Sequence, residues 1–536
     1  MSTQLHQLPV RGKGPEQQIE VRPIYVEEWL DTLPYIDFHN TSKLLHDALH
    51  ASNKVPMKFT QRLELITLYN RPYQYYLDSQ VKAGAQHTLQ SIQTMQSQLE
   101  SMKRLAVELA RGSRLAVDEA LNHKSLWGQN KFPLQAIVSA MIYISHALIF
   151  SFLEYAPTPK NVWQELNFLY QFAEGTNQHR TPVKLLNTSK KGISVSIEHV
   201  YKQIVLASLA DPYHLPFGAI WEIYNQLDTW AEYAEVRSFV EVDDAAGYFV
   251  VCLNGDVHPV PYSKFEKSQV TDHHRLIDAN KLRVIVQQQL GKIGSRTAQD
   301  EHFVLSPHYA KTLLEIMHKA WGLPAQRFFP RQAATGNLVI TQGLNSSYFH
   351  INRRQDFTYQ GQPDSDVTVN NARDNLDKTT RYTQEIWNLV DTSAGGVAVT
   401  RDGRPGNGVR VGDLVGFSPN GQGNPQSDWK IGSIRWLLIR QIKIYKAGIQ
   451  TIANRAYPAA VRAITGSEAD RDYRRAFLTG NPAKEKEFSI ITSKGLYSAG
   501  RELEINFDDK PLKVSANKLI ESTFGFDQFN CKTTHQ

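Results

Sequence analysis

The sequence contains very little cysteine and no concentrated charge. Cys252 and Cys531 are the two cysteines among 536 residues, and they lie far apart. This excludes a disulfide framework and a zinc knuckle and favours a reducing cytoplasm. The formal net charge is +6, with no long run of Lys and Arg. Because nucleic-acid binders usually concentrate basic charge on one face, we expect no nucleic-acid polymer as a partner, whereas a small anionic ligand is compatible.

Motifs for catalysis and metal binding are missing as well. The chain has no P-loop, no dinucleotide-binding fingerprint and no Gly-x-Ser-x-Gly elbow. Asp272-His273-His274 is followed by no further His or carboxylate at the spacing of metal ligands. We therefore predict no catalytic residues, no metal and no enzyme activity.

Residues 1–20 are polar and lack the apolar core of a secretory signal, so we expect no such signal there. One uncharged stretch, Leu134 to Leu153, reaches the roughly 20 residues that can span a bilayer. It stands alone and also carries Gln135, Ser139, Ser145, His146 and Ser151. This mixed composition favours a buried core helix over a stable membrane span.

Length and composition predict several folding units of a globular α+β protein. The hydrophobic fraction is 41% and the charged fraction 21%, both typical of folded domains. We divide the chain into a helical region (1–235), a mixed α/β connecting region (236–321), a β-barrel (322–465) and a C-terminal β appendage (486–536). Paired amphipathic helices in the first region suggest a helical-repeat-like array, although no repeat of fixed period occurs.

The barrel prediction depends on many short strands separated by Gly, Asn and Asp turns. Such density is typical of a small antiparallel barrel. A polar insertion at 352–385 interrupts it and is interpreted as an extended loop. The predicted strands cover residues 338–340, 348–351, 387–390, 397–400, 414–417, 431–438 and 446–452.

Two motifs accompany this barrel. Arg327-Phe-Phe-Pro-Arg331 follows a predicted helix that ends at Trp321, and Asp391-Thr-Ser393-Ala-Gly395-Gly396 closes a predicted strand. Together with Arg410 to Leu414 and Ile431 to Trp436, they resemble the PilZ family, small barrels that receive the bacterial second messenger cyclic di-GMP. The resemblance covers about residues 322–462.

The resemblance implies a binding site for cyclic di-GMP. Arg327 and Arg331 would take the phosphates and guanine edges, because arginine forks onto phosphate and pairs with guanine O6 and N7. Asp391, Ser393 and Gly396 would form the opposite wall, where Asp accepts from guanine N–H groups. Gly395 and Gly396 would let the ligand approach the backbone. No other cofactor is expected.

The chain departs from the family pattern in its spacing. Sixty positions separate Arg331 from Asp391, where the family has a few tens, and the 352–385 insertion absorbs the excess. This insertion could cover the pocket, supply contacts from Arg353, Arg354 or Arg381, or mark a site that has lost its ligand. Gln326 also replaces a residue that is often basic in relatives.

Other interpretations of the same residues stay open. The arginines could cover a barrel rim with their aliphatic stems, and the Asp-Gly segment could be an ordinary turn. The barrel could then be a degenerate adaptor that acts through protein contacts. An enzyme acting on a nucleotide is a further alternative, in which Asp391 or the Asp272–His274 cluster would carry turnover. Glu119-Ala-Leu121 spells a cyclic di-GMP phosphodiesterase signature, but it lacks the strands and metal carboxylates of that class, so we interpret it as a chance match.

The helical region has its own candidates for a protein partner. Arginine and tyrosine are favoured at interfaces, although helix faces and core rims are the simpler explanation for these residues. The preferred prediction is a cytoplasmic bacterial receptor that relays cyclic di-GMP binding to an unidentified protein through its helical region. The candidate partner residues are Arg62, Arg71, Tyr73, Tyr75 and Tyr76.

Overall fold

The computed structural model forms two compact units. The first runs to Pro212 and resumes from Gly218 to Gln326, and the second comprises Tyr213–Phe217 and the chain from Arg327 onward. This arrangement of helices followed by antiparallel barrels confirms the multidomain α+β class. The structure describes residues 19–85, 92–122, 133–185, 194–293, 305, 310–323, 329–355, 357, 382–403, 405, 408–419, 429–440, 444–464, 472–480, 487–508, 510–523 and 525–533.

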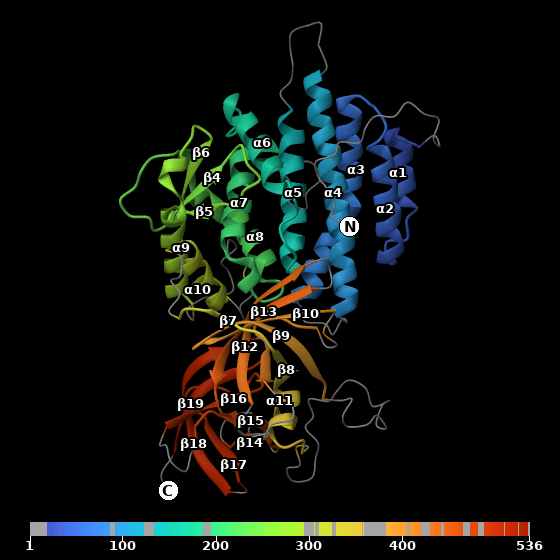
Figure 1. The fold of residues 1–536 in the computed structure, drawn as a ribbon. Coiled ribbons are helices and arrows are strands. Elements are labelled where there is room, and N and C mark those ends of the chain that lie inside the picture. The colour runs from blue at the N-terminus through green and yellow to red at the C-terminus, as the bar shows by residue number, and fades with distance from the viewer. Residues whose placement is uncertain are drawn as a thin grey trace. The chain divides into compact units, whose positions relative to one another are not determined.

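Eight α-helices build most of the first unit (Figure 1). Helix α4 packs against α2, α3 and α5, and α5 in turn contacts α6, α7 and α8. A two-stranded hairpin, β1 (Val183–Lys184) with β2 (Ser194–Val195), precedes α7. The helices are α1 (Pro23–Asp31), α2 (Phe38–Ser52), α3 (Phe59–Ala85), α4 (Ile92–Asn122), α5 (Leu134–Leu153), α6 (Val162–Gly175), α7 (Ile197–Leu209) and α8 (Ala219–Trp230).

Helix α5 is the apolar stretch that is long enough to cross a membrane. Of its most apolar 18-residue window, 89% is buried within the structure. Ser145 and Ser151 donate their hydroxyls to the carbonyls of Met141 and Ala147 one turn earlier, so the buried polar groups are satisfied. The burial agrees with the prediction of a core helix.

The predicted partner groove of Arg and Tyr side chains is not formed, because most of them are internal. Arg62 of α3 is almost fully buried and forks onto Glu119 of α4, with N–O distances of 2.7 and 2.8 Å. Tyr73 and Tyr76 are buried, whereas Tyr75 is exposed. The Glu119-Ala-Leu segment thus has a structural role: Glu119 balances a buried guanidinium, which would otherwise be costly to desolvate.

A small antiparallel sheet follows the helices in the order β3-β6-β4-β5. The Asp256 carboxylate docks this region on α6 by accepting from the backbone N–H groups of Asn161 (2.6 Å) and Trp163 (3.1 Å) at the start of that helix. The elements are β3 (Glu235–Ser238), β4 (Tyr248–Cys252), β5 (Val260–Pro261), β6 (His274–Asp278), α9 (Asn280–Gly291) and α10 (Ala310–Ala320).

The second unit begins with a barrel in which six strands close into the ring β8-β9-β10-β13-β12-β11, and β7 adds to β9. Hydrophobic side chains that alternate along these strands fill the inside. The strands are β7 (Gln332–Ala333), β8 (Asn337–Gln342), β9 (Gln384–Ser393), β10 (Gly396–Asp402), β11 (Leu414–Ser418), β12 (Lys430–Arg440) and β13 (Ile444–Ala453).

One predicted strand of this barrel is wrong. Residues 348–351 form the end of helix α11 (Gly343–Ile351), which packs on β8, β11, β14 and β15. Tyr348, Phe349 and Ile351 have strand-forming side chains, but all three are buried, Tyr348 and Ile351 in a cluster with residues of those strands and Phe349 against the Tyr382 ring. Tertiary packing therefore outweighs local preference. Most of the 352–385 insertion, including Arg381, lies outside the described residues.

A second closed barrel has the strand order β14-β15-β16-β19-β18-β17. Its first two strands begin before residue 486, where the sequence analysis began the C-terminal β segment. Phe477, Ile431 and Phe526 belong to one buried cluster that joins the two barrels. The strands are β14 (Tyr457–Ala463), β15 (Arg474–Leu478), β16 (Glu487–Thr492), β17 (Glu502–Phe507), β18 (Lys510–Ser522) and β19 (Asp527–Thr533).

His146 makes the helical unit sensitive to acid. It lies buried in α5 with the Tyr73 hydroxyl 2.9 Å from Nδ1, and burial lowers its pKa from 6.5 to about 4. Below about pH 6.5 His146 therefore binds a proton in the unfolded chain but stays neutral in the folded unit until the pH nears 4. Between pH 7 and pH 5 this should remove about 2 kcal/mol of stability, because stability is lost as the pH falls from the unfolded pKa towards the folded one.

The test is amide hydrogen exchange of α5 in the full chain at pH 7 and pH 5, corrected for intrinsic rates. The matched control is His146→Asn, which keeps an acceptor for Tyr73 but does not titrate. Between pH 7 and pH 5 the variant should lose about 2 kcal/mol less stability than the natural protein. Equal losses would mean that His146 is not the responsible group.

Candidate functional site

Strand pairing brings the two sequence motifs together. β7 directly follows Arg331, and Gln332 and Ala333 of β7 pair with Thr392 and Asp391 of β9. The separation of 60 positions in the sequence therefore does not keep the two motifs apart in space. The end of the arginine motif lies beside the Asp391–Gly396 segment. Arg327 itself lies outside the described residues.

A β-bulge in β9 turns the second motif outward. Leu389 pairs with Val399, whereas Asp391 pairs with Ala398, so Val390 is the extra residue. Trp387 and Val399 line the barrel interior, and simple alternation would direct Asp391 inward as well. The bulge shifts this alternation. Asp391 and Ser393 consequently lie on the outer face, where both are partly exposed.

Two side-chain contacts fasten the arginine segment to this hairpin. Arg331 Nη1 lies 3.2 Å from Asp391 Oδ2, and the two side chains are 37% and 23% exposed. The exposed Phe329 ring lies against Gly395, where an added Cβ would be 3.2 Å from it. An ion pair with this exposure contributes about 0–1 kcal/mol. A phosphate could therefore replace Asp391 as the partner of Arg331 at little cost.

Gly396 of the motif allows the backbone of β10 to lie close to the backbone of β13. A Cβ on Gly396 would lie 2.1 Å from the Ile449 carbonyl oxygen, so no side chain fits there. The Gly395 carbonyl accepts from Thr451 N–H at 3.0 Å. The Ser393 hydroxyl donates to the Gly396 carbonyl at 3.3 Å. This long bond leaves the hydroxyl available to a better acceptor.

The outer face continues across β13 to β12 and includes residues that the motif analysis gave no role. Gly448 pairs with Ala398 and with Trp436. A Cβ on Gly448 would lie 1.9 Å from Trp436 Nε1, so the indole covers this glycine. Ala398 and Gly448 thus form a floor of small residues between Asp391 and a partly buried aromatic wall. We call this surface, from Arg331 and Asp391 to Trp436, the outer face.

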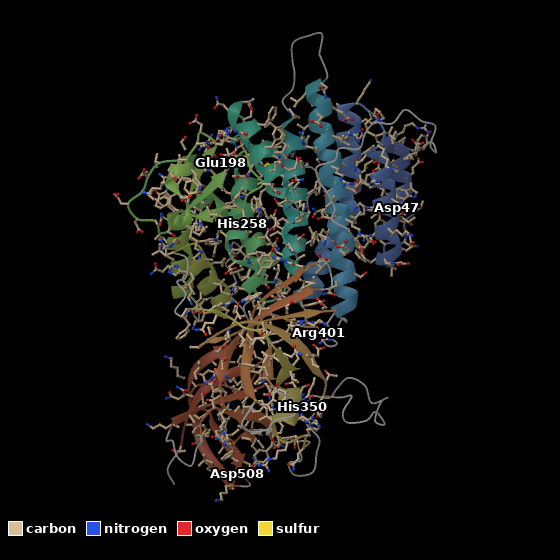
Figure 2. The ribbon with its side chains drawn as sticks, viewed as in Figure 1. Asp47, Glu198, His258, His350, Arg401 and Asp508 are labelled. Atoms are coloured by element: carbon tan, nitrogen blue, oxygen red, sulfur yellow. The ribbon has the colours of Figure 1, made fainter. Side chains whose placement is uncertain are left out.

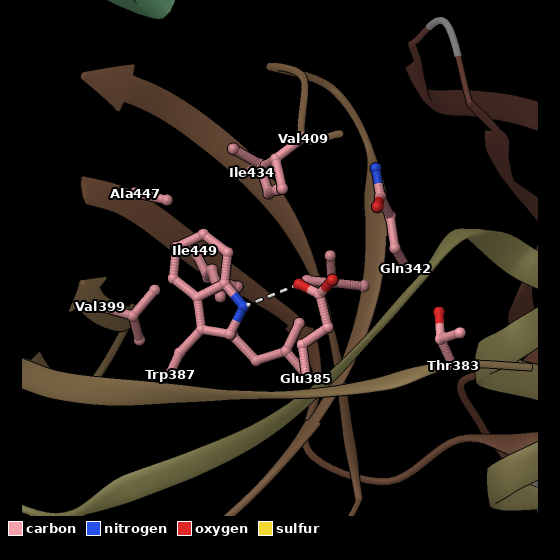
Figure 3. A pocket seen from close by; sticks show the side chains of 11 residues that line it. Gln342, Thr383, Glu385, Trp387, Val399, Val409, Ile434, Ala447 and Ile449 are labelled. Atoms are coloured by element: carbon pink, nitrogen blue, oxygen red, sulfur yellow. Dashed lines mark hydrogen bonds between the residues drawn. The ribbon is translucent and has the colours of Figure 1, made fainter. Parts of the chain in front are cut away.

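The barrel interior offers no alternative site. Figure 3 shows its cavity, where Trp387 Nε1 donates to Glu385 Oε2 at 3.4 Å. The cavity volume is about 20 Å³, which is room for about one water molecule. A dinucleotide requires several hundred Å³, so a ligand of that size does not fit in this cavity. The lining residues include Ile340, Val399, Val415, Ile434, Ala447 and Ile449.

The first unit contains a larger concave site of about 430 Å³ between α6 and the small sheet. Three guanidinium groups line it, but each is balanced by a carboxylate of the same unit. The site therefore offers little surplus positive charge to a doubly anionic ligand. The pairs are Arg180–Glu198, with Glu198 labelled in Figure 2, Arg237–Asp278 and Arg275–Glu174.

The Asp272–His274 cluster has a structural explanation. His274 is buried, and its Nδ1 accepts from Thr271 N–H at 3.0 Å. Within the part of the chain that the structure describes, no three His, Cys, Asp or Glu side chains gather as metal ligands do. Arg353 and Arg354 follow α11, which packs on β8 and β11, whereas the outer face lies on β9, β10, β13 and β12.

Fold and site together define a multidomain protein with a PilZ-like barrel. Family models for the cyclic-di-GMP receptor FimW match almost the whole chain: its N-terminal domain at residues 25–240, its middle PilZ domain at 248–380 and 358–458, and its C-terminal β-barrel domain at 459–534. The chain belongs to this PilZ-domain family. It is also 22% identical to the cyclic-di-GMP receptor FimW of Pseudomonas aeruginosa over 591 aligned positions, which cover 99% of this chain and 95% of that protein.

Gly396 provides a test of the backbone geometry. Gly396→Ala should lower the unfolding free energy by about 2–3 kcal/mol, because its methyl group must push β10 away from the Ile449 carbonyl. The matched control is Gly395→Ala, whose methyl group meets only the exposed Phe329 ring, which can move. Urea unfolding of both variants measures the difference. Similar losses in the two variants would contradict the close approach of β10 to β13.

Proposed function

We propose that this protein is a cyclic di-GMP receptor that binds its ligand on the outer face. The observation that carries the proposal is the pairing of β7 with β9, which brings Arg331 to Asp391 at the start of the Asp391–Gly396 segment. The family match and the FimW relative support the ligand. They also support a receptor rather than an enzyme.

The chemistry of the outer face suits two phosphates and two guanines. Arg331 can exchange its weak contact with Asp391 for a phosphate, because charge-assisted hydrogen bonds to phosphate are stronger. Asp391, once released, can accept from guanine N–H groups. Trp436 offers an aromatic surface on which a base can stack. Arg327 enters the proposal through its place in the sequence motif.

The helical unit is proposed as the region that contacts a protein partner, within a cytoplasmic signalling protein. Ile36 is fully exposed and Tyr75 is 55% exposed, and the Tyr35 and Tyr75 rings contact each other with centroids 5.8 Å apart. Exposed apolar and aromatic side chains of this kind are frequent in protein interfaces. Cysteines without a disulfide, Cys252 and Cys531, are consistent with a reducing compartment.

Calorimetric titration of the full chain with cyclic di-GMP tests the receptor. Arg331→Ala and Arg327→Ala should each weaken binding about 10- to 100-fold, because each removes a charge-assisted contact of about 1.5–3 kcal/mol. Arg455→Ala is the matched control, since it removes the same charge from an arginine that packs over Tyr457 in the second barrel. It should leave the affinity within about two-fold.

Two results would contradict the proposal. The natural protein could fail to bind with both units folded, which would leave a PilZ-like scaffold that acts through protein contacts. Alternatively, Arg331→Ala could bind as tightly as Arg455→Ala, in which case the ligand would lie elsewhere on the chain.

A further inference from the structure

A third arginine reaches the outer face through a bulge in β12. The strand register passes from Ile434 opposite Ile449 to Trp436 opposite Gly448, so Arg435 is the extra residue. Ile434 lines the barrel interior, and Leu437 is fully buried opposite Ala447, which also lines it. Arg435 and Trp436 between them therefore both lie on the outside.

Gln450 of β13 lies between the Arg435 side chain and the glycines of the second motif. Arg435 Nε donates to Gln450 Oε1 at 2.6 Å. Gln450 pairs directly with Gly396, where an added Cβ would be 3.1 Å from the Gln450 Cα atom. One exposed side chain thus separates Arg435 from the backbone that we propose the ligand approaches. Adjacent strands lie about 4.8 Å apart, so a ligand on Gly396 needs to extend over one further strand to reach Arg435.

The Arg435 guanidinium forms an ion pair with a carboxylate of the second barrel. Glu521 of β18 accepts from both Arg435 Nη1 and Nη2, the latter at 2.7 Å. The side chains are 32% and 19% exposed, so water reaches the pair only in part. The fork holds the guanidinium in one orientation and cancels its charge towards the outer face.

We propose that Arg435 is a further ligand-contacting cation of the outer face, and that Glu521 competes with cyclic di-GMP for it. This inference rests on the proposed function. The ligand carries two negative charges, and Glu521 places a third beside the same guanidinium. A like charge at this position weakens binding of an anionic ligand. Glu521 therefore limits the affinity, and the ligand gains Arg435 by displacing it.

The same competition links the nucleotide site to the second barrel. If Glu521 lowers the affinity for ligand, then the ligand must weaken the Arg435–Glu521 pair by the same factor, because coupling between two binding events is reciprocal. Ligand binding would then release β18 from one of its ties to the middle barrel. The C-terminal barrel would then be the part of the second unit that responds to ligand binding on the outer face.

The experiment is titration of the full chain with cyclic di-GMP, comparing Arg435→Ala, Glu521→Gln and the double variant. Arg435→Ala should weaken binding about ten-fold, whereas Glu521→Gln should tighten it about three- to ten-fold by removing the competing charge. In the double variant the gain should disappear, because Glu521 acts through Arg435. If replacing Arg435 weakens binding and replacing Glu521 tightens it, the two residues compete, because loss of a purely structural ion pair would change the affinity in the same direction for both.

Glu504→Gln is the matched control. It makes the same charge change in the second barrel, where Glu504 pairs with Arg462 at 2.8 Å, and it should leave the affinity within about two-fold. Thermal unfolding establishes that each variant is folded. If Glu521→Gln does not fold, Glu521→Asp withdraws the carboxylate by one methylene and should tighten binding in the same direction.

Unchanged or weaker binding by Glu521→Gln would overturn the competition. So would a gain that persists in the double variant, because Glu521 would then act through its field alone. If the natural protein itself shows no binding, the receptor function fails. That outcome is distinct from a natural protein that binds and a Glu521→Gln variant that binds no better.

Discussion

The candidate site depends on the bulge at Val390. β9 carries Trp387 and Leu389 into the barrel, and regular alternation would bury Asp391 and Ser393 in the same apolar interior. Burying a carboxylate there without a cation would be strongly unfavourable. One extra residue converts this arrangement into an outward-facing motif. The D-x-S-x-x-G motif faces outward only because the bulge at Val390 lies directly before it.

β9 also explains how distant segments meet. Its first half pairs with β8 and its last residues pair with β7, while β10 runs along the other side. A single strand therefore closes the barrel and holds the arginine segment. The 352–385 insertion enters between β8 and β9, and a long surface insertion adds little loop entropy. The barrel can close around the same strand pairs whatever the insertion does.

Sequence reasoning predicted the barrel and named most residues of the candidate site for a physical reason. Arg331, Asp391, Ser393 and the glycines belong to short motifs whose spacing reflects local backbone geometry, and the structure brings them together. Trp436 and Arg435 were visible as a motif block but received no role. Their outward direction follows from a second bulge, and hydrophobic alternation alone does not reveal where a bulge lies.

The errors in the sequence reading have a common origin in long-range contacts. Arg62 looked like an interface residue because its partner, Glu119, lies 57 positions away. Tyr348–Ile351 looked like a strand because its packing surface comes from β8, β11 and β15. Local pattern can report which side chains are apolar or charged. It cannot report which distant element covers them. Here those distant elements decided that Arg62 is buried and that Tyr348–Ile351 is helical.

Exposure separates the ion pairs that hold the fold from those that a ligand can rearrange. Arg62–Glu119 is almost fully buried, so removing either partner would leave a charge without compensation. Arg331–Asp391 and Arg435–Glu521 are both partly accessible, so their charges can exchange partners while keeping contact with water. A receptor for an anion needs cations that are held in place but not irreversibly neutralised. Arg331 and Arg435 are in that intermediate condition, because each is paired with one partly accessible carboxylate.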